Sequence, residues 1–449
     1  MRQPYRIESV TLKDIGVFEH THFDFPPIQS ELRDGEKAEI HIFTGPNGCG
    51  KSTVLYALAA IFDPFSNKHP ISKRFLNGYS LVDFKFGNGH GFYCVNKIDT
   101  SLFIDQDYLI NPVGKTHYYG DKNFRDLIKN YAYYFDIERM LNDTDFQFAA
   151  FAYSGNTSHQ DEFVFDSIKE IDYSPFENAL SFYKTIRSDV IAQWIANNLT
   201  KYALAKIEQE DEEANKYQES LGKIKAFIFN LSGIKIDFKL SRSPLSIVFN
   251  IDDKCMAFDS LPEGLKSIIG WVCDLAIRLE YLKFEEKKDI FSQPLILFLD
   301  EIDIHLHPKW QRRILPAIQK LLPNSQVFVS THSPFVVGSV EDAWVYRLPD
   351  PQRNVMRDAS MQDQIVPTES GAGKSIQLIL EEIFDVDERF DVETEQLLKS
   401  FKKVRNRYLQ NPTDDSELMD LAQTIRERGE ELETIIEMEL RQIARRSKK

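Results

Sequence analysis

The 449-residue sequence is poor in cysteine, has no long apolar run and carries more acidic than basic residues. Its four cysteines lack the spacing of a zinc site or a redox pair, which argues against a disulfide framework and against structural zinc. No run approaches the roughly 20 apolar residues that span a bilayer, and residues 1–4 show no secretory signal, so we expect a cytoplasmic protein without a membrane partner. The formal net charge of −15 argues against non-specific binding of nucleic acid.

What the chain does contain is a phosphate-binding loop. Residues 45–52 read GPNGCGKS and fit the motif G-x-x-x-x-G-K-[ST], with an apolar strand pattern before them and a helical pattern after them. The motif predicts ATP or GTP binding, with Lys51 at the β/γ-phosphates and the Ser52 hydroxyl on Mg²⁺. The residues expected to contact the nucleotide are Gly45, Pro46, Asn47, Gly48, Cys49, Gly50, Lys51, Ser52 and Thr53.

Two further apolar segments end in polar residues that suit the same site. Residues 295–301, LILFLDE, predict a buried parallel strand that ends in Asp300 and Glu301. Asp300 would hold Mg²⁺, and Glu301 would orient or deprotonate the attacking water. A third strand pattern ends before His332, which we expect to touch a γ-phosphate. Lys51 and Asp300 are 249 positions apart, so a large insertion separates them.

Together the segments GPNGCGKS, LILFLDE, IDIHLHP and STHSP resemble the heads of ABC-type ATPases. Within that group the chain is similar to the structural-maintenance-of-chromosomes (SMC) and DNA-repair ATPases, and more so to the OLD-like and PtuA-like stand-alone bacterial ATPases. The resemblance implies an α/β fold: a three-layer P-loop head with an antiparallel β-lobe, a helical lobe and a C-terminal helical region. It also implies ATP and Mg²⁺ held between two heads of a homodimer or higher homo-oligomer.

In such dimers each head supplies a signature motif to the other head's nucleotide. The matching segment here is residues 261–267, LPEGLKS, where Pro262 replaces the serine that the family usually has. The resemblance therefore implies that Gly264 acts across the dimer, and the missing serine predicts slow hydrolysis. It also implies that the loop IDIHLHP lies at the dimer interface and that Asp303 couples the two sites.

The same resemblance suggests a division of the chain. We expect the ATPase head at residues 1–345, with an aromatic-rich insertion at 65–150 and a helical lobe at 180–232, and a C-terminal helical region at 346–449. The charged stretch at 206–219 lacks sustained heptads, so we expect a short helical hairpin and not a long coiled coil. In the C-terminal region an apolar stripe at helical spacing suits packing on the head, on a second copy or on a partner protein.

Several residues allow more than one interpretation. Phe18 could stack on the nucleotide base or pack in the core, and either Gln147 or Gln106 could be the glutamine that contacts Mg²⁺ in this family. His305 and His307 have H-x-H spacing, but no further metal ligands lie nearby in the sequence.

Two segments imitate other motifs. Residues 371–375, GAGKS, look like the end of a second P-loop but lack its first glycine and a preceding strand, so we expect a loop before a helix. Asp385 and Asp387 have the spacing of a metal-binding pair in the nuclease domains fused to OLD-like ATPases. The residues that follow are too few for that domain, and we expect no built-in nuclease.

Three functions agree with these observations. The resemblance favours an anti-phage defence ATPase of the PtuA kind, a nucleotide-gated dimeric switch that holds and regulates a separate nuclease. The alternative is a DNA-repair or recombination ATPase that clamps DNA directly, which the acidic charge disfavours. A third is an ATP-dependent scaffold whose hydrolysis is incidental.

Overall fold

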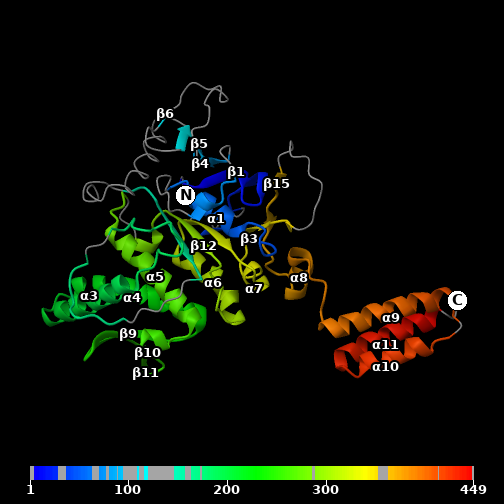
Figure 1. The fold of residues 1–449 in the computed structure, drawn as a ribbon. Helices are drawn as coiled ribbons and strands as arrows, with labels where there is room; N and C mark the ends of the chain where they lie inside the picture. Colours follow the sequence, from blue (N-terminus) through cyan, green and yellow to red (C-terminus); the bar gives the residue numbers. More distant parts are fainter. Residues whose placement is uncertain are drawn as a thin grey trace. The chain divides into compact units, whose positions relative to one another are not determined.

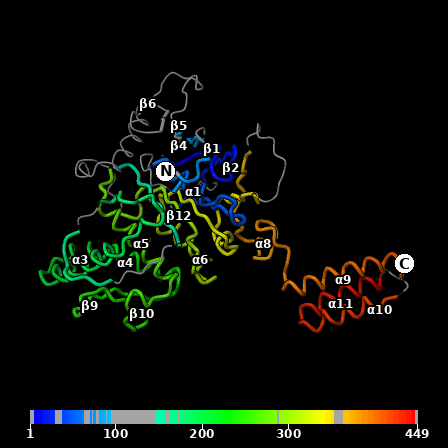
Figure 2. The backbone as a smooth tube through the Cα atoms, viewed as in Figure 1, coloured from blue at the N-terminus to red at the C-terminus, as the bar shows by residue number. Residues whose placement is uncertain are grey.

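The computed structural model describes most of the chain, and Figures 1 and 2 show its ribbon and its backbone. The described residues are 5–28, 37–62, 70–76, 80–87, 89–94, 109–110, 116–119, 146–156, 163–171, 174–285, 289–351, 363–412 and 414–446. They form two compact units, Met1–Ile379 and Leu380–Lys449. The division falls later than the expected boundary at residue 345, because two short strands and the first four residues of the helix Ile376–Phe384 belong to the first unit.

The first unit is built on a six-stranded sheet, which we call the core sheet. Five of its strands run parallel to one another. Each connection between them carries the chain back to the end of the sheet where the strands begin. The sixth, β16, is antiparallel to β14. The order is β16 (Thr368–Glu369), β14 (Ala343–Arg347), β3 (Glu39–Thr44), β13 (Ser325–Ser330), β12 (Leu295–Asp300) and β8 (Ala149–Ser154). Strands β12, β13 and β8 are buried at every position, as the apolar sequences of β12 and β8 predict.

A second sheet forms the β-lobe. Its order is β15 (Asp363–Ile365), β2 (Phe18–Asp24), β1 (Ile7–Ile15), β4 (Leu81–Phe86), β5 (Gly89–Cys94), β7 (Thr116–Tyr119) and β6 (Leu109–Ile110). All neighbours are antiparallel except β15 and β2. Helix α1 (Lys51–Ala59) contacts both β1 of this lobe and three strands of the core sheet, so it forms the layer between the two sheets.

Helices cover the rest of the first unit. The helical lobe is the hairpin of α3 (Ser188–Ile207) and α4 (Asp211–Ser232), and both helices contact α5 (Glu263–Tyr281). A three-stranded sheet of β9 (Ile236–Arg242), β10 (Leu245–Ile251) and β11 (Lys254–Met256) leads from the hairpin to α5. The remaining helices are α6 (Pro308–Leu321), α7 (Pro334–Val337) and α8 (Ile376–Phe384), with 3-10 turns at Pro70–Lys73, Phe258–Ser260 and Ile290–Ser292.

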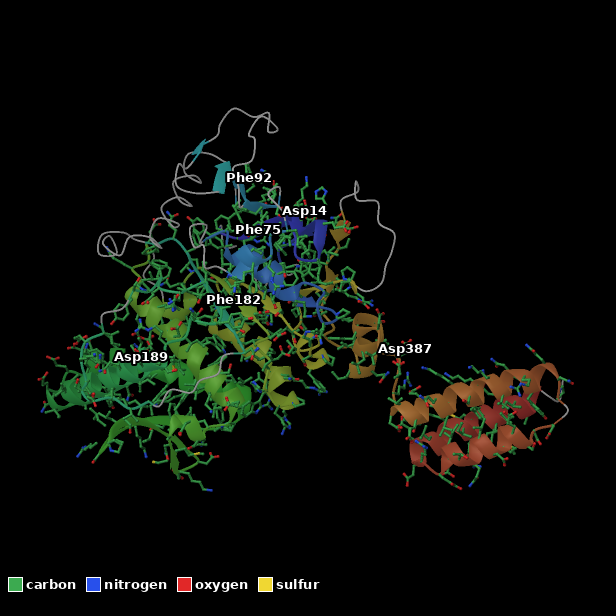
Figure 3. All side chains as sticks on the ribbon, in the orientation of Figure 1. Asp14, Phe75, Phe92, Phe182, Asp189 and Asp387 are labelled. Atoms are coloured by element: carbon green, nitrogen blue, oxygen red, sulfur yellow. The ribbon has the colours of Figure 1, made fainter. Side chains whose placement is uncertain are left out.

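The second unit is a bundle of α9 (Val392–Gln410), α10 (Ser416–Arg426) and α11 (Glu430–Arg446). The expected apolar stripe is buried inside this bundle: Leu418, Ile425, Leu432, Ile436 and Ile443 pack with Phe401 and Val404 of α9. The stripe therefore packs on its own unit and is not left open for a second copy or a partner. Asp387, labelled in Figure 3, lies before α9, and no described residues form a group of acidic, histidine or cysteine side chains that could hold a metal.

Candidate functional site

The site lies where the parallel strands of the core sheet end. Asp300 of β12 pairs in register with Ser154 of β8, and Ser330 of β13 pairs with Phe43 of β3. The P-loop follows β3 directly and leads into α1. Because the carboxyl ends of parallel strands meet at one edge, residues far apart in the sequence become neighbours here.

The P-loop has the backbone that its glycines permit. Gly45, Gly48 and Gly50 all have positive φ, of 147°, 79° and 100°. A Cβ atom on Gly50 would lie 2.6 Å from the ring of Phe18, so this glycine is also required by close packing. Phe18 itself is 4% exposed and packs edge-on against Phe23, as expected for a core residue.

Lys51 points back over the loop. Its Nζ donates to the carbonyl oxygens of Gly45 at 3.0 Å and Pro46 at 2.9 Å, and it lies 3.6 Å from the Cys49 sulfur. Burial lowers the pKa of Lys51, and the nearby charges of Glu301 and Asp300 oppose this shift. Burial also raises the pKa of the Cys49 thiol, which is 1% exposed, so this cysteine is an inert small residue in the loop.

Asp300 is the centre of the polar contacts. Its Oδ1 accepts hydrogen bonds from the hydroxyls of Ser52 at 2.9 Å and Ser330 at 2.6 Å, and its Oδ2 accepts one from Tyr56 at 3.3 Å. Burial raises the pKa of Asp300, and these hydroxyls work against that rise. The Ser52 and Asp300 oxygens converge as hard-oxygen ligands, the kind that Mg²⁺ takes, so the residues fit the ion.

Glu301 and His332 complete this edge. The carboxylate of Glu301 is 3.9 Å from His332 Nε2, and both side chains are partly exposed. Glu301 has an unusual positive φ of 51°, and its amide donates to the Ser330 hydroxyl at 2.9 Å. Burial lowers the pKa of His332, and the charge of Lys51 lowers it further, which favours a neutral imidazole. The structure thus brings together Lys51, Ser52, Asp300, Glu301 and His332, as the sequence predicts.

Gly155 and Tyr56 were not predicted. Gly155 directly follows β8, and its amide donates to the Asp300 carbonyl at 2.8 Å. A Cβ atom at Gly155 would lie 2.1 Å from the Glu301 carbonyl oxygen, so only glycine allows this approach. The glycine at the end of an apolar strand was the available signal. For Tyr56 the signal was its position four residues after Ser52, on the same face of α1.

Gln147 was placed wrongly as a candidate Mg²⁺ contact. It precedes β8, at the opposite end of the strand from Ser154 and Asp300, and its side chain bonds Tyr5 and Glu285. Six residues of strand separate it from the site by roughly 20 Å. The alternative candidate, Gln106, lies outside the described residues.

Gly264 is the second residue of α5, the helix of the signature segment, and is buried. A Cβ atom there would lie 2.7 Å from the carbonyl oxygen of His305, in the loop after β12. Packing within the chain is therefore sufficient reason for this glycine. In the same loop, His307 caps α6 by accepting from the Lys309 amide at 3.2 Å, and Asp303 is 7% exposed with no partner for its Oδ1 among the described residues.

The GAGKS segment at 371–375 is a turn before α8. Ser375 Oγ accepts from the Leu378 amide at 3.2 Å, and Gly371 packs against Ile379 of the same helix. The strand that precedes this turn, β16, has two residues and runs antiparallel to β14, unlike β3, so the residues form a helix start and not a second P-loop. Among the described residues, no helix has the length and apolarity needed to cross a bilayer.

Comparisons with known proteins agree with this geometry. Residues 115–338 match a family described as "AAA domain, putative AbiEii toxin, Type IV TA system", and residues 5–82 match one described as "AAA domain". The chain is 23% identical to a retron Vc95 probable ATPase of Vibrio cholerae, over 93% of this chain and 87% of that protein. It is also 23% identical to the Septu protein PtuA of Bacillus thuringiensis, over 78% and 79%.

Among solved structures, an SMC head domain from Thermotoga maritima covers 81% of this chain and 99% of its own, at 15% identity and a TM-score of 0.40. By these matches the chain is similar to P-loop ATPases, among them proteins named for retron and Septu systems.

Proposed function

We propose that the protein binds and hydrolyses ATP with Mg²⁺ and works as a nucleotide-gated dimeric switch. The observation that carries this proposal is the convergence of Ser52 and Asp300, 2.9 Å apart, beside the P-loop lysine and the Glu301–His332 pair. Bound Mg²⁺ supplies charge neutralisation between the phosphates. The protein's own residues supply the binding, the orientation and the proton transfer.

Each residue has a role that its position supports. Lys51 exchanges the carbonyl oxygens of Gly45 and Pro46 for phosphate oxygens, and the P-loop amides cradle the same phosphates. Ser52 and Asp300 hold the metal ion. Glu301 orients the attacking water and takes its proton, and His332 donates to the γ-phosphate.

A second copy of the chain completes the switch. Gly264 and the N-terminus of α5 would meet the nucleotide of the partner, and Asp303 would couple the two sites. Shared nucleotide favours the closed dimer, and hydrolysis releases it, so ATP biases two conformational states. The similarity to the PtuA and retron proteins supports a defence role, and the acidic chain disfavours direct clamping of DNA. In that role the switch would hold and regulate a separate nuclease.

The test of the enzyme is phosphate release by the purified chain with Mg²⁺ and ATP, beside Lys51→Ala. We expect Lys51→Ala to weaken nucleotide binding by roughly 100-fold, because it removes charge-assisted contacts to two phosphates. Equal affinity in the variant would contradict the assigned site.

The test of the partner is purification of tagged Glu301→Gln chain from its own host with Mg-ATP, followed by mass spectrometry. A stoichiometric nuclease that is lost when Lys51 is also replaced supports the gating role. Recovery of the chain with DNA that resists nuclease digestion would instead support direct clamping of DNA.

A further inference from the structure

Two hydroxyls from one face of α1 reach the same carboxylate. Ser52 and Tyr56 are four residues apart, so their side chains lie one above the other on the helix. Ser52 bonds Oδ1 of Asp300 and Tyr56 bonds Oδ2, which fixes both oxygens of the carboxylate. Tyr56 is 3% exposed, so water does not compete for this contact.

A second tyrosine supports the first. The hydroxyl of Tyr183 lies 2.8 Å from that of Tyr56. A tyrosine hydroxyl has one proton, and Tyr56 gives it to Asp300, so Tyr183 is the donor between the two tyrosines. The neighbouring Phe182 has a positive φ of 64°, and its ring packs edge-on against Tyr56 at 4.7 Å. Figure 3 labels Phe182 within the first unit.

The segment that carries Tyr183 is hydrogen-bonded to α5, the helix of the signature segment, which we call the signature helix. Arg278 of α5 is fully buried, and its guanidinium donates to the carbonyl oxygens of Thr185 at 2.8 Å and Pro175 at 2.6 Å. Asp274, one turn earlier on α5, accepts from Arg278 Nε at 2.6 Å and so holds the guanidinium in place. A continuous set of hydrogen bonds and short backbone therefore joins Asp300 to α5.

We propose that Tyr56 and Tyr183 form a hydroxyl relay that positions Asp300 for the divalent cation and links this carboxylate to the signature helix. Both are positioning residues that act through Asp300. This inference rests on the proposed function, because it assigns the relay to the same metal site. Partners in the outer shell of a metal ligand typically change metal affinity by roughly 10- to 100-fold when they are lost.

The test is the equilibrium binding of a fluorescent ATP analogue titrated with Mg²⁺, which needs no turnover. We expect Tyr56→Phe to raise the Mg²⁺ concentration at half-maximal binding about 10-fold, with unchanged binding in EDTA. Tyr183→Phe should give a smaller shift, and the double variant should match Tyr56→Phe alone, since Tyr183 acts through Tyr56. The matched control is Tyr93→Phe, because Tyr93 is also buried and bonds the α1 carbonyl of Ala57 at 2.7 Å but not Asp300.

The outcomes separate the two proposals. If the wild-type chain binds no nucleotide with Mg²⁺, the proposed function fails. If it binds nucleotide but Tyr56→Phe and Tyr93→Phe give the same midpoint, the relay is overturned and the function stands. Should Tyr56→Phe not fold, Tyr183→Phe decides: Tyr183 is half exposed, and an unchanged Mg²⁺ midpoint in that variant overturns the relay.

Discussion

The two ends of the core sheet carry polar networks of different kinds. Where β3 and β13 begin, Glu39 accepts from Arg6 at 2.5 Å, from Gln326 at 2.8 Å and from His41 at 2.7 Å. Gln326 also bonds both backbone groups of Ile7, which joins the core sheet to the β-lobe. Burial acts to raise the pKa of Glu39, but His41 and Arg6 outweigh it and hold that pKa below its usual value.

Where the same strands end, the polar atoms are less completely matched. Lys51 rests on backbone carbonyls, and Asp303 keeps one oxygen without a partner among the described residues. A closed network stabilises a fold, whereas exchangeable partners leave capacity for a ligand. The first set of residues holds the two sheets together, and the second set leaves polar groups available for the proposed phosphates and metal ion.

The largest expected effect is that of Glu301→Gln, a substitution at the carboxyl end of the core-sheet strands. We expect turnover to fall roughly 100-fold or more, because a positioned base is lost, while ATP binding persists and a dimer accumulates. Phosphate release and light scattering measure the two effects. The matched control is Glu285→Gln, a carboxylate bonded to Gln147 near the opposite end of β8. Wild-type turnover in Glu301→Gln would remove Glu301 as the base.

At the other end, Arg6→Ala should act on stability and not on nucleotide binding. It leaves Glu39 buried without its main cation, which costs about 3 kcal/mol in the free energy of unfolding. Urea denaturation measures the loss, and nucleotide affinity should be unchanged. Arg187→Ala removes an exposed arginine pair and should cost about 1 kcal/mol or less. Weakened nucleotide binding with wild-type stability would refute the structural role of this network.

Gly155→Ala tests how closely residues pack where β8 and β12 of the core sheet end. The new methyl group must displace the Glu301 carbonyl, which should lower the free energy of unfolding by about 1–3 kcal/mol. Turnover should fall about 10-fold or more, since Glu301 moves away from its aligned position. Gly222→Ala is the control, because a Cβ in that part of α4 meets nothing within 4 Å. Equal behaviour of the two variants would show that the contact at Gly155 is not restrictive.

The smallest expected effect is the pH response of Asp303. Burial raises its pKa to about 6, the Thr331 hydroxyl opposes this rise, and the charges of Glu301 and Asp300 add to it. The folded chain keeps this proton at pH values where the unfolded chain releases it, so stability falls as pH rises from about 4 to 6.

Asp303→Asn should remove that slope and raise the free energy of unfolding at pH 7.5 by roughly 1–2 kcal/mol. Urea denaturation at pH 5 and 7.5 measures both quantities. Asp189→Asn, an exposed aspartate of α3, is the control and should leave the pH slope as it is in the wild type. A slope that survives in Asp303→Asn would assign it to other groups.

The sequence was sufficient to predict most of the polar residues that gather at the carboxyl end of the core-sheet strands. Lys51, Asp300 and His332 each follow a buried strand or a glycine loop, and parallel strands bring such ends together. Gln147 was misjudged because strand direction was not applied to it: it precedes its strand and so lies at the far edge. Tyr56 and Gly155 were missed because no motif marks them, and their importance depends on atoms of other strands.

The apolar stripe of the C-terminal region shows a second limit of prediction from sequence. Apolar spacing correctly indicated which faces of 416–446 are buried, but spacing does not say what covers them. The cover is α9, through Phe401 and Val404, and the sequence of α9 alone carries no sign of that pairing.

That self-contained bundle has an evolutionary consequence. Its three helices bury their apolar residues in one another, so residues 392–446 carry a hydrophobic core of their own. Substitutions on the exposed faces of a bundle with its own core can therefore accumulate without changing the residues around Asp300 and Glu301.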